Sequence, residues 1–284
     1  MVASDLIVVG PSGFIGKKLV QFAQYSGRVA LEAGRTVDLA SKRDISLRDC
    51  AQIFWLASSV SPYSAELNPE IAKRDLDYFS EVLENLLREN AEAHVVLASS
   101  GGAVYADGEP PFTEFDPVDS RLVYANLKIE MENVLIESGL PHVILRIANA
   151  YGPGQLTGRG QGVLAEWISS LKNGDRPKLF GSMEVVRDFV HIDDVVKALW
   201  LAGQVKDFSG IINIGSGKPV SLKDCLTLLS QISDQDIEIT TVESRPVDRA
   251  RVYLSIDRAA SVLNWVPEIS LEQGLKAWWN DWEQ

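Results

Sequence analysis

A tyrosine and a lysine stand four residues apart near the middle of the chain, at Tyr124 and Lys128. They fall in a helical pattern over residues 121–138 that stops at Gly139. Residues four apart share one face of a helix, so an ammonium placed there stabilises a phenolate and lowers the pKa of the phenol. Such a phenol can exchange a proton near neutral pH. Because this spacing also arises by chance, its meaning depends on the segments around it.

A glycine-rich turn lies between a strand pattern and a helix pattern near the N-terminus. The continuous apolar run over residues 6–9 is typical of a parallel strand buried on both faces. The turn's backbone amides and the start of the next helix can hold a pyrophosphate, although a merely tight turn is the alternative. We expect a dinucleotide to contact Gly10, Ser12, Gly13, Phe14, Ile15 and Gly16.

The next strand pattern ends at Glu32, where a carboxylate can accept hydrogen bonds from both ribose hydroxyls and favours NAD. Arg35 follows three residues later and is suited to the 2′-phosphate of NADP, so NADP stays open. In the segment from 36 to 49 we expect Asp44 and Ile45 to line the adenine. Asp44 is equally readable as a solvated loop carboxylate.

A third buried strand over residues 53–58 ends in Leu56, Ala57 and Ser58, which leave room for a cofactor to cross its carboxyl end. The helix pattern over residues 69–89 places Asp75 on the apolar stripe that faces the sheet. A carboxylate there must be hydrogen-bonded or must border a site. Asp75 is therefore either a neighbour of the site or a satisfied structural residue.

Two hydroxyls and two glycines follow the strand pattern over residues 94–98, at Ser99, Ser100, Gly101 and Gly102. Alone, the segment reads as a polar turn. Glycines at a strand's carboxyl end also let a ligand approach the backbone. Together with Tyr124, the segment supplies the further hydroxyl of an acid–base relay.

Composition limits the kinds of partner. The 284 residues carry a net charge of −12 without a Lys/Arg run, which argues against nucleic-acid binding and a polybasic membrane anchor. No apolar run approaches the ~20 residues of a membrane span and no signal-peptide layout is visible, so we expect a cytoplasmic protein. Cys50 and Cys225 are expected as reduced structural thiols, and the three histidines lack ligand spacing, so we expect no metal.

The order of these features resembles the extended short-chain dehydrogenase/reductase family, specifically its sugar-nucleotide epimerases, dehydratases and reductases. The resemblance covers nearly the whole chain. Besides the glycine triplet, the strand end at Leu56-Ala57-Ser58, Ser99-Ser100 and the Tyr124/Lys128 pair, it rests on Arg-x-x-Asn-x-Tyr-Gly-Pro at residues 146–153 and Arg-Asp-Phe-x-His-x-Asp-Asp at residues 187–194.

The resemblance implies an α/β fold, with a Rossmann-type doubly wound parallel sheet and a smaller α/β C-terminal lobe that binds substrate. We expect the NAD(P)-binding domain to comprise residues 1–150 plus about 183–208. The sugar-nucleotide lobe would then comprise residues 151–182 plus about 209–284. Four of the seven tryptophans fall between Trp265 and Trp282, as expected for packing of that lobe.

The family's roles transfer to matching positions. Tyr124 would be the general acid/base, and Lys128 would lower its pKa and bind the nicotinamide ribose. The relay hydroxyl would be Ser100 or, less readily, Ser99. Cofactor contacts would extend to Ala148. Substrate contacts would come from Asn149, Phe180 at the nucleobase, Arg187 and Arg245 at the diphosphate, and Asp248.

Two positions depart from the family pattern. The relay hydroxyl usually stands where this chain has Gly101, and Asp75 stands where the family often has Asn. No carboxylate follows the serines, although the family's dehydratases and decarboxylases place one there, so oxidation and reduction at C4 are favoured over elimination.

The resulting expectation is an NAD-dependent 4-epimerase of a nucleotide-diphosphate sugar of the UDP-hexose type, working through a transient 4-keto sugar. The alternative is an NAD(P)H-dependent 4-ketoreductase of dTDP- or GDP-deoxysugar synthesis, because the stretch between Glu32 and Ile53 is compact as in such reductases. An inactive dinucleotide sensor is the alternative of another class. The resemblance also implies a homodimer, formed through a four-helix contact that includes the Tyr124 helix.

Overall fold

A six-stranded parallel sheet forms the centre of the molecule. A computed structural model describes residues 6–33, 47–119, 121–158, 161–243 and 249–282. The strand order is β10-β5-β4-β3-β1-β2. The bounds are β1 (Leu6–Val9), β2 (Ala30–Ala33), β3 (Gln52–Trp55), β4 (His94–Ser100), β5 (His142–Ile147) and β10 (Gly210–Ile214).

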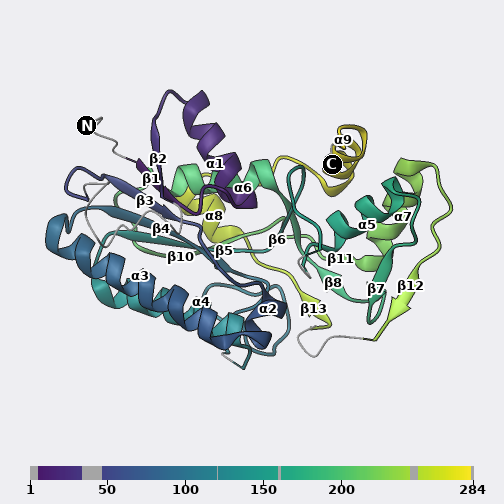
Figure 1. Cartoon of the computed structure of the whole chain (residues 1–284), viewed down its shortest axis with the longest axis horizontal. Coiled ribbons are helices and arrows are strands. Elements are labelled where there is room, and N and C mark those ends of the chain that lie inside the picture. The colour runs from purple at the N-terminus through teal and green to yellow at the C-terminus, as the bar shows by residue number, and fades with distance from the viewer. Residues whose placement is uncertain (1–5, 34–46, 120, 159–160, 244–248, 283–284) are drawn as a thin grey trace.

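Helices cover both faces of this sheet (Figure 1). One face packs on α1 (Phe14–Tyr25), α6 (Ile192–Ala202) and α8 (Asp257–Leu263), and the other on α3 (Pro69–Glu89) and α4 (Val123–Ser138), with α2 (Pro62–Leu67) beside them. Side chains alternate along a strand, so Leu6 and Val8 join the first core while Ile7 and Val9 join the second. This is the doubly wound α/β sheet that the sequence predicts.

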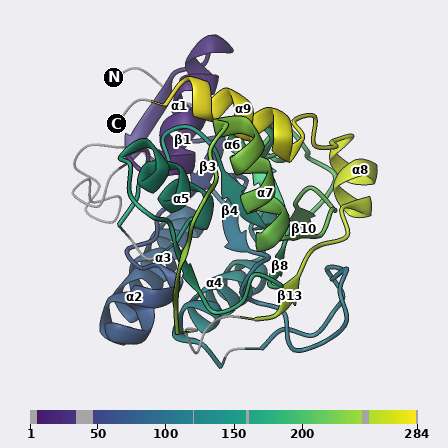
Figure 2. The same ribbon diagram turned by 90° about the vertical axis from the view of Figure 1, so that its right-hand side faces the viewer.

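A smaller lobe lies beyond the carboxyl end of the sheet (Figures 1 and 2). Trp167 and Trp278 are buried in its separate core. The lobe contains α5 (Val163–Lys172), α7 (Leu222–Ser233), α9 (Leu271–Asn280), the pair β7 (Lys178–Phe180) and β12 (Thr240–Val242), and the small sheet of β11 (Val220–Ser221), β8 (Val186–Arg187) and β13 (Arg251–Val252). The pair β6 (Asn149–Tyr151) and β9 (Phe189–His191) runs between the lobe and the main sheet.

More of the C-terminal part of the chain belongs to the main sheet and its helices than we expected. The sequence assigned residues from about 209 onward to the lobe, whereas β10 pairs in parallel with β5 as an edge strand of the central sheet. Trp265, also expected in the lobe, is buried in the first core together with Ala259 and Leu263 of α8. The difference depends on tertiary contacts that the sequence pattern does not show. β5 pairs with one further strand, β10, and α8 then covers that strand.

Two local features place the residues of interest. β4 extends two residues beyond the expected end at Ala98, because Ser99 and Ser100 pair with Arg146 and Ile147 of β5. α4 ends at Gly139, whose φ of +73° is a left-handed conformation that glycine adopts without strain. Within the described residues, no helix is both long and apolar enough to cross a bilayer.

Candidate active site

The turn after β1 forms a cradle of bare backbone. Gly10 has a φ of +91°, and a Cβ there would lie 2.8 Å from the backbone of Ala57. A Cβ on Gly16 would overlap the carbonyl oxygen of Gly10. α1 begins after Gly13 with no side-chain cap and no acidic residue in its first turn. Its positive N-terminus therefore faces a turn without side-chain bulk, which fits a pyrophosphate.

Other residues expected to contact the cofactor lie on this turn, at the start of α1, or just after β3. Ser12 is exposed on the turn, while Phe14 and Ile15 open α1 and pack against the core beneath it. Leu56 donates its N–H to Val9 at 2.9 Å, which places Ala57 against Gly10. Ser58 follows and donates its hydroxyl to the carbonyl of Val60 at 2.9 Å.

Glu32 lies on β2 beside the cradle. It is exposed and is the register partner of Val8, while Gly10 donates its N–H to the carbonyl of Ala33 at 3.0 Å. The carboxylate is therefore close in the fold to the turn expected to hold the pyrophosphate. Arg35, Asp44 and Ile45 lie outside the described residues.

Tyr124 meets Ser100 at the carboxyl end of β4. Burial raises the pKa of Tyr124 to about 12, and its hydrogen bond with Ser100 offsets part of that increase. The sequence predicted a lowered pKa because of Lys128. The structure differs because the Lys128 ammonium lies 5.9 Å from the centroid of the phenol ring and donates to the carbonyl of Ala98 at 3.0 Å. Desolvation of the phenol therefore dominates.

Lys128 is buried one turn along α4 from Tyr124, with 4% of its surface exposed. Burial lowers the pKa of its ammonium to about 8, and the carboxylates of Asp75 and Glu132 offset part of the loss. Asp75 is also a satisfied residue, since it accepts hydrogen bonds from the backbone and the hydroxyl of Ser59. The expectation of a satisfied structural residue is therefore confirmed, and a role of Asp75 beside the site stays a prediction.

Ser99 belongs to a different network from Ser100. Its hydroxyl donates to the carboxylate of Glu132, which forms a buried ion pair with Arg146 at 2.6 Å. The sequence did not identify Glu132, although it follows Lys128 by four residues and so continues the face that carries Tyr124 and Lys128. The pair gives each of these two side chains, which are only 3–4% exposed, a partner of opposite charge.

The substrate side begins where β5 ends. Ala148 donates its N–H to Ile214 at 2.8 Å, and Asn149 holds the carbonyl of Asp188 through its backbone N–H and side-chain amide, both at 3.0 Å. A Cβ built on Gly102 would meet nothing closer than that amide, at 4.0 Å. Gly102 and the side-chain amide of Asn149 therefore lie next to each other.

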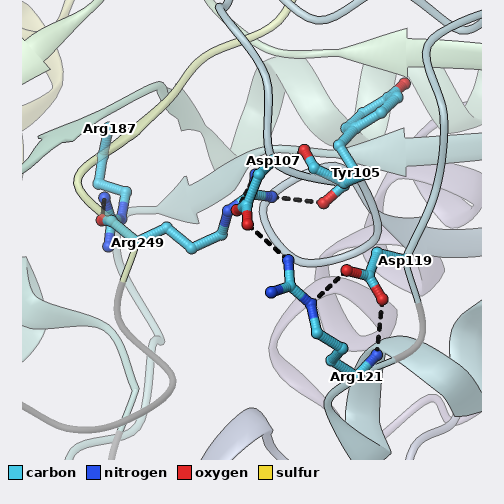
Figure 3. Close-up of polar contacts among 7 residues, drawn as sticks. Tyr105, Asp107, Asp119, Arg121, Arg187 and Arg249 are labelled. Atoms are coloured by element: carbon cyan, nitrogen blue, oxygen red, sulfur yellow. Dashed lines mark hydrogen bonds and ion pairs between the residues drawn. The ribbon is translucent and has the colours of Figure 1, made fainter.

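Arg187 lies on β8 and donates to the carbonyls of Val186 at 3.0 Å and Arg249 at 2.7 Å (Figure 3). Phe180 ends β7 in the lobe. Arg245 and Asp248 lie outside the described residues. The sequence did not indicate Arg249, whose guanidinium donates to the carbonyls of Tyr105 and Ala106 (Figure 3). No motif marks it, because its partners are backbone carbonyls.

Metal chemistry finds no support in the described part of the chain, where no group of three or more His, Cys, Asp or Glu side chains is placed to hold an ion. The cradle, the Ser100/Tyr124 pair and Gly102 all lie at the carboxyl end of the parallel strands. That edge is where ligands bind in open α/β sheets. The arrangement suits proton transfer beside a bound dinucleotide.

Comparison with known proteins gives consistent matches. The model of the NAD dependent epimerase/dehydratase family matches residues 6–215. A putative UDP-glucose 4-epimerase of Methanocaldococcus jannaschii is 31% identical over 85% of this chain and 79% of its own. The dTDP-4-dehydro-6-deoxyglucose reductase of Escherichia coli is 28% identical over 96% of this chain and 95% of its own. The crystal structure of the UDP-glucose 4-epimerase of Thermotoga maritima with UDP-glucose has a TM-score of 0.89 at 27% identity, covering 97% of both chains.

Proposed function

Because the chain belongs to the NAD dependent epimerase/dehydratase family, we propose that it is an NAD-dependent 4-epimerase of UDP-hexoses. This family assignment makes it an enzyme of the extended short-chain dehydrogenase/reductase type. The observation that carries the proposal is the hydrogen bond between Tyr124 and Ser100 at the carboxyl end of β4, with Gly102 and Asn149 beside it. A sugar placed there has a proton acceptor at one carbon, and Gly102 adds no side-chain bulk next to it.

The chain's own residues supply the proton transfer and the tether. Tyr124 takes the proton of the C4 hydroxyl and later returns it, while Ser100 donates a hydrogen bond that stabilises the phenolate. Lys128 supplies a positive charge on the same helix face. NAD, when bound on the glycine cradle, supplies the oxidation at C4 and its reversal. Arg187 and Asn149 hold the diphosphate so that the sugar turns without leaving.

NAD is preferred to NADP in this proposal because Glu32 stands exposed beside the cradle. A carboxylate there accepts hydrogen bonds from ribose hydroxyls and repels a 2′-phosphate. Exchanging Glu32 for Gln removes the repulsion, so we expect the ratio of the Kd values for NADP and NAD to fall by about tenfold. Titration of each cofactor by calorimetry measures that ratio.

A 4-ketoreductase of deoxysugar synthesis is the second candidate. It is favoured by the similarity to the Escherichia coli reductase, which spans 96% of this chain, and by the compact stretch between Glu32 and Ile53. A reductase binds reduced cofactor and releases it oxidised in each turnover. An epimerase regenerates its cofactor and therefore retains it.

Purified protein separates the two candidates. We expect bound NAD to co-purify, and interconversion of UDP-glucose and UDP-galactose to proceed without added cofactor. Protein that emerges empty, and that consumes NADPH only when given a dTDP- or GDP-4-keto sugar, would be the reductase. Protein that binds NAD normally and turns over no nucleotide sugar would be a dinucleotide sensor.

We also propose a homodimer in a reducing compartment such as the cytoplasm. α3 and α4 lie together on the outer face of the sheet, and each exposes a large apolar side chain, Leu87 at 38% and Ile136 at 44%. Cys50 and Cys225 are buried as free thiols, as suits reducing conditions. Sedimentation of the wild type and of Ile136→Glu tests the dimer, which the variant is expected to dissociate.

A further inference from the structure

Arg249 contacts the segment Tyr105–Asp107, which follows β4, through several hydrogen bonds of its guanidinium (Figure 3). Its guanidinium donates to the carbonyl of Tyr105 and, at 2.6 Å, to the carbonyl of Ala106. It also reaches the carboxylate of Asp107 at 3.4 Å and lies 5.5 Å from the centroid of the Phe112 ring. With 20% of its side chain exposed, Arg249 is largely enclosed by these partners.

The Tyr105–Asp107 segment also contacts residues that lie near Ser100 and Tyr124. Tyr105 is buried, stacks beneath Arg146 at 5.0 Å and donates its hydroxyl to Asn213 at 2.6 Å. It follows Ser100 by five residues. Asp107 also bonds Arg121 at 2.6 Å, and Arg121 stands three residues before Tyr124. Displacing this segment therefore displaces the surroundings of both Ser100 and Tyr124.

The backbone of Arg249 contacts the substrate side. Its carbonyl accepts a hydrogen bond from Arg187 at 2.7 Å. The next residue, Ala250, accepts the N–H of Val186 at 2.8 Å, and β13 then pairs with β8. Arg187 therefore takes its orientation partly from the backbone that Arg249 anchors.

We propose that Arg249 is a positioning residue for the nucleotide sugar, setting the distance between Arg187 and the Ser100/Tyr124 pair. The inference rests on the proposed function, in which Arg187 holds the diphosphate. A guanidinium fork can bond two successive carbonyls at once, whereas the ammonium of lysine is a point donor and cannot reproduce the fork. The side chain of Arg249 holds the Tyr105–Asp107 segment, and its carbonyl holds Arg187. One residue therefore sets the position of Arg187 relative to the Ser100/Tyr124 pair.

Arg249→Ala and Arg249→Lys test this role, with Arg258→Ala and Arg258→Lys as matched controls. Arg258 also donates to a backbone carbonyl, that of Ile211 at 3.0 Å, and also lies over an aromatic ring, that of Phe115 at 4.5 Å. Its partners lie on β10 and the loop beside it, and include neither Arg187 nor the Tyr105–Asp107 segment. The Arg258 variants therefore remove similar contacts without changing the proposed distance between Arg187 and the Ser100/Tyr124 pair.

The readouts are KM for the UDP-hexose, and Kd for UDP and for NAD by calorimetry. We expect Arg249→Ala to raise KM and the UDP Kd at least about tenfold and to leave the NAD Kd unchanged. Arg249→Lys should fall between Arg249→Ala and the wild type, and the Arg258 variants should stay within about twofold. Hydrogen exchange should also show less protection at residues 105–107 in the Arg249 variants.

Folded Arg249 variants whose KM and UDP Kd match the wild type would overturn the inference, even if they melt at a lower temperature. If Arg249→Ala does not fold, Arg249→Lys decides by the same criterion. Wild-type protein that binds none of UDP, dTDP and GDP would instead refute the proposed function, and the inference with it. The wild-type titration thus distinguishes the two failures.

Discussion

Ser99 and Ser100 are neighbours in β4, yet their hydroxyls contact different turns of α4. Ser100 bonds Tyr124, and Ser99 bonds Glu132 within the buried pair with Arg146. The sequence reduced the relay hydroxyl to these two candidates and preferred Ser100 without excluding Ser99, because strand alternation alone does not say which side chain meets which turn of the helix. The structure favours Ser100 for the relay.

Alanine at each serine separates the two networks. Ser100→Ala removes a hydrogen bond to the proton-exchanging phenol, so we expect kcat to fall about 10²-fold with stability little changed. Ser99→Ala removes a donor from a buried carboxylate, so we expect the free energy of unfolding to fall by about 1–2 kcal/mol with kcat largely kept. Urea unfolding and steady-state kinetics on both variants measure this. A catalytic loss in Ser99→Ala larger than in Ser100→Ala would reverse the assignment.

Lys128 makes stability depend on pH. Its folded pKa of about 8 lies below the ordinary value of 10.5, so the unfolded chain binds more protons between these values. Stability therefore rises with pH across that window, and the full cost of burying the charge is present below pH 8.

Replacing Lys128 with Met removes that cost. We expect Lys128→Met to be more stable than the wild type at pH 7 by up to about 3 kcal/mol, and the difference to shrink as pH rises from 8 to 10.5. Urea unfolding at several pH values measures this, and Lys17→Met, at an exposed lysine of α1, should follow the wild type. A difference that stays constant with pH would contradict the account.

At the scale of elements, the start of α4 depends on a neighbouring helix. Leu122 provides no side-chain cap, and instead Glu66 of α2 accepts the N–H of Val123 at 2.7 Å. An anion at a helix N-terminus bonds an orphan N–H and meets the positive end of the helix dipole. Glu66 therefore fixes the first turn of α4, in which Tyr124 lies.

Glu66→Ala should accordingly lower the free energy of unfolding by about 1 kcal/mol, as loss of a helix cap does. Glu66→Gln keeps an acceptor without the charge and should lose less. Glu81→Ala, at an exposed position of α3, provides the control. If Glu66→Ala and Glu81→Ala have equal stability in urea, the cap contributes nothing.

The sequence predicted the elements with strong periodicity and missed those defined by tertiary contacts. The bounds of α3 are as predicted, because 21 residues carry a long apolar stripe. α8 has seven residues, too few for a clear period. The strand β10 at residues 210–214 was not predicted, because its place beside β5 depends on the chain returning to the main sheet. Arg249 escaped notice for a similar reason, since backbone carbonyls leave no pattern in the sequence.

At the scale of the whole molecule, the main sheet and the smaller lobe meet at the carboxyl end of the parallel strands (Figure 1). The glycine cradle and the Ser100/Tyr124 pair belong to the parallel sheet and its helices, whereas Phe180 and Arg187 come from the lobe side (Figure 1). A reaction that oxidises and reduces one carbon of a tethered sugar needs both parts. The sequence assigned residues from about 183 to 208, and therefore Arg187, to the NAD(P)-binding domain, whereas β8 places Arg187 in the small sheet of the lobe. The register between the parts required coordinates.

The most direct test of the account is turnover by Tyr124→Phe measured at equal NAD occupancy. The substitution removes the phenol oxygen and keeps the ring, so the fold and NAD binding should persist. We predict a loss of about 10²–10⁴-fold in kcat for interconversion of UDP-glucose and UDP-galactose. A Tyr124→Phe enzyme that retains NAD and turns over at the wild-type rate would contradict the central claim.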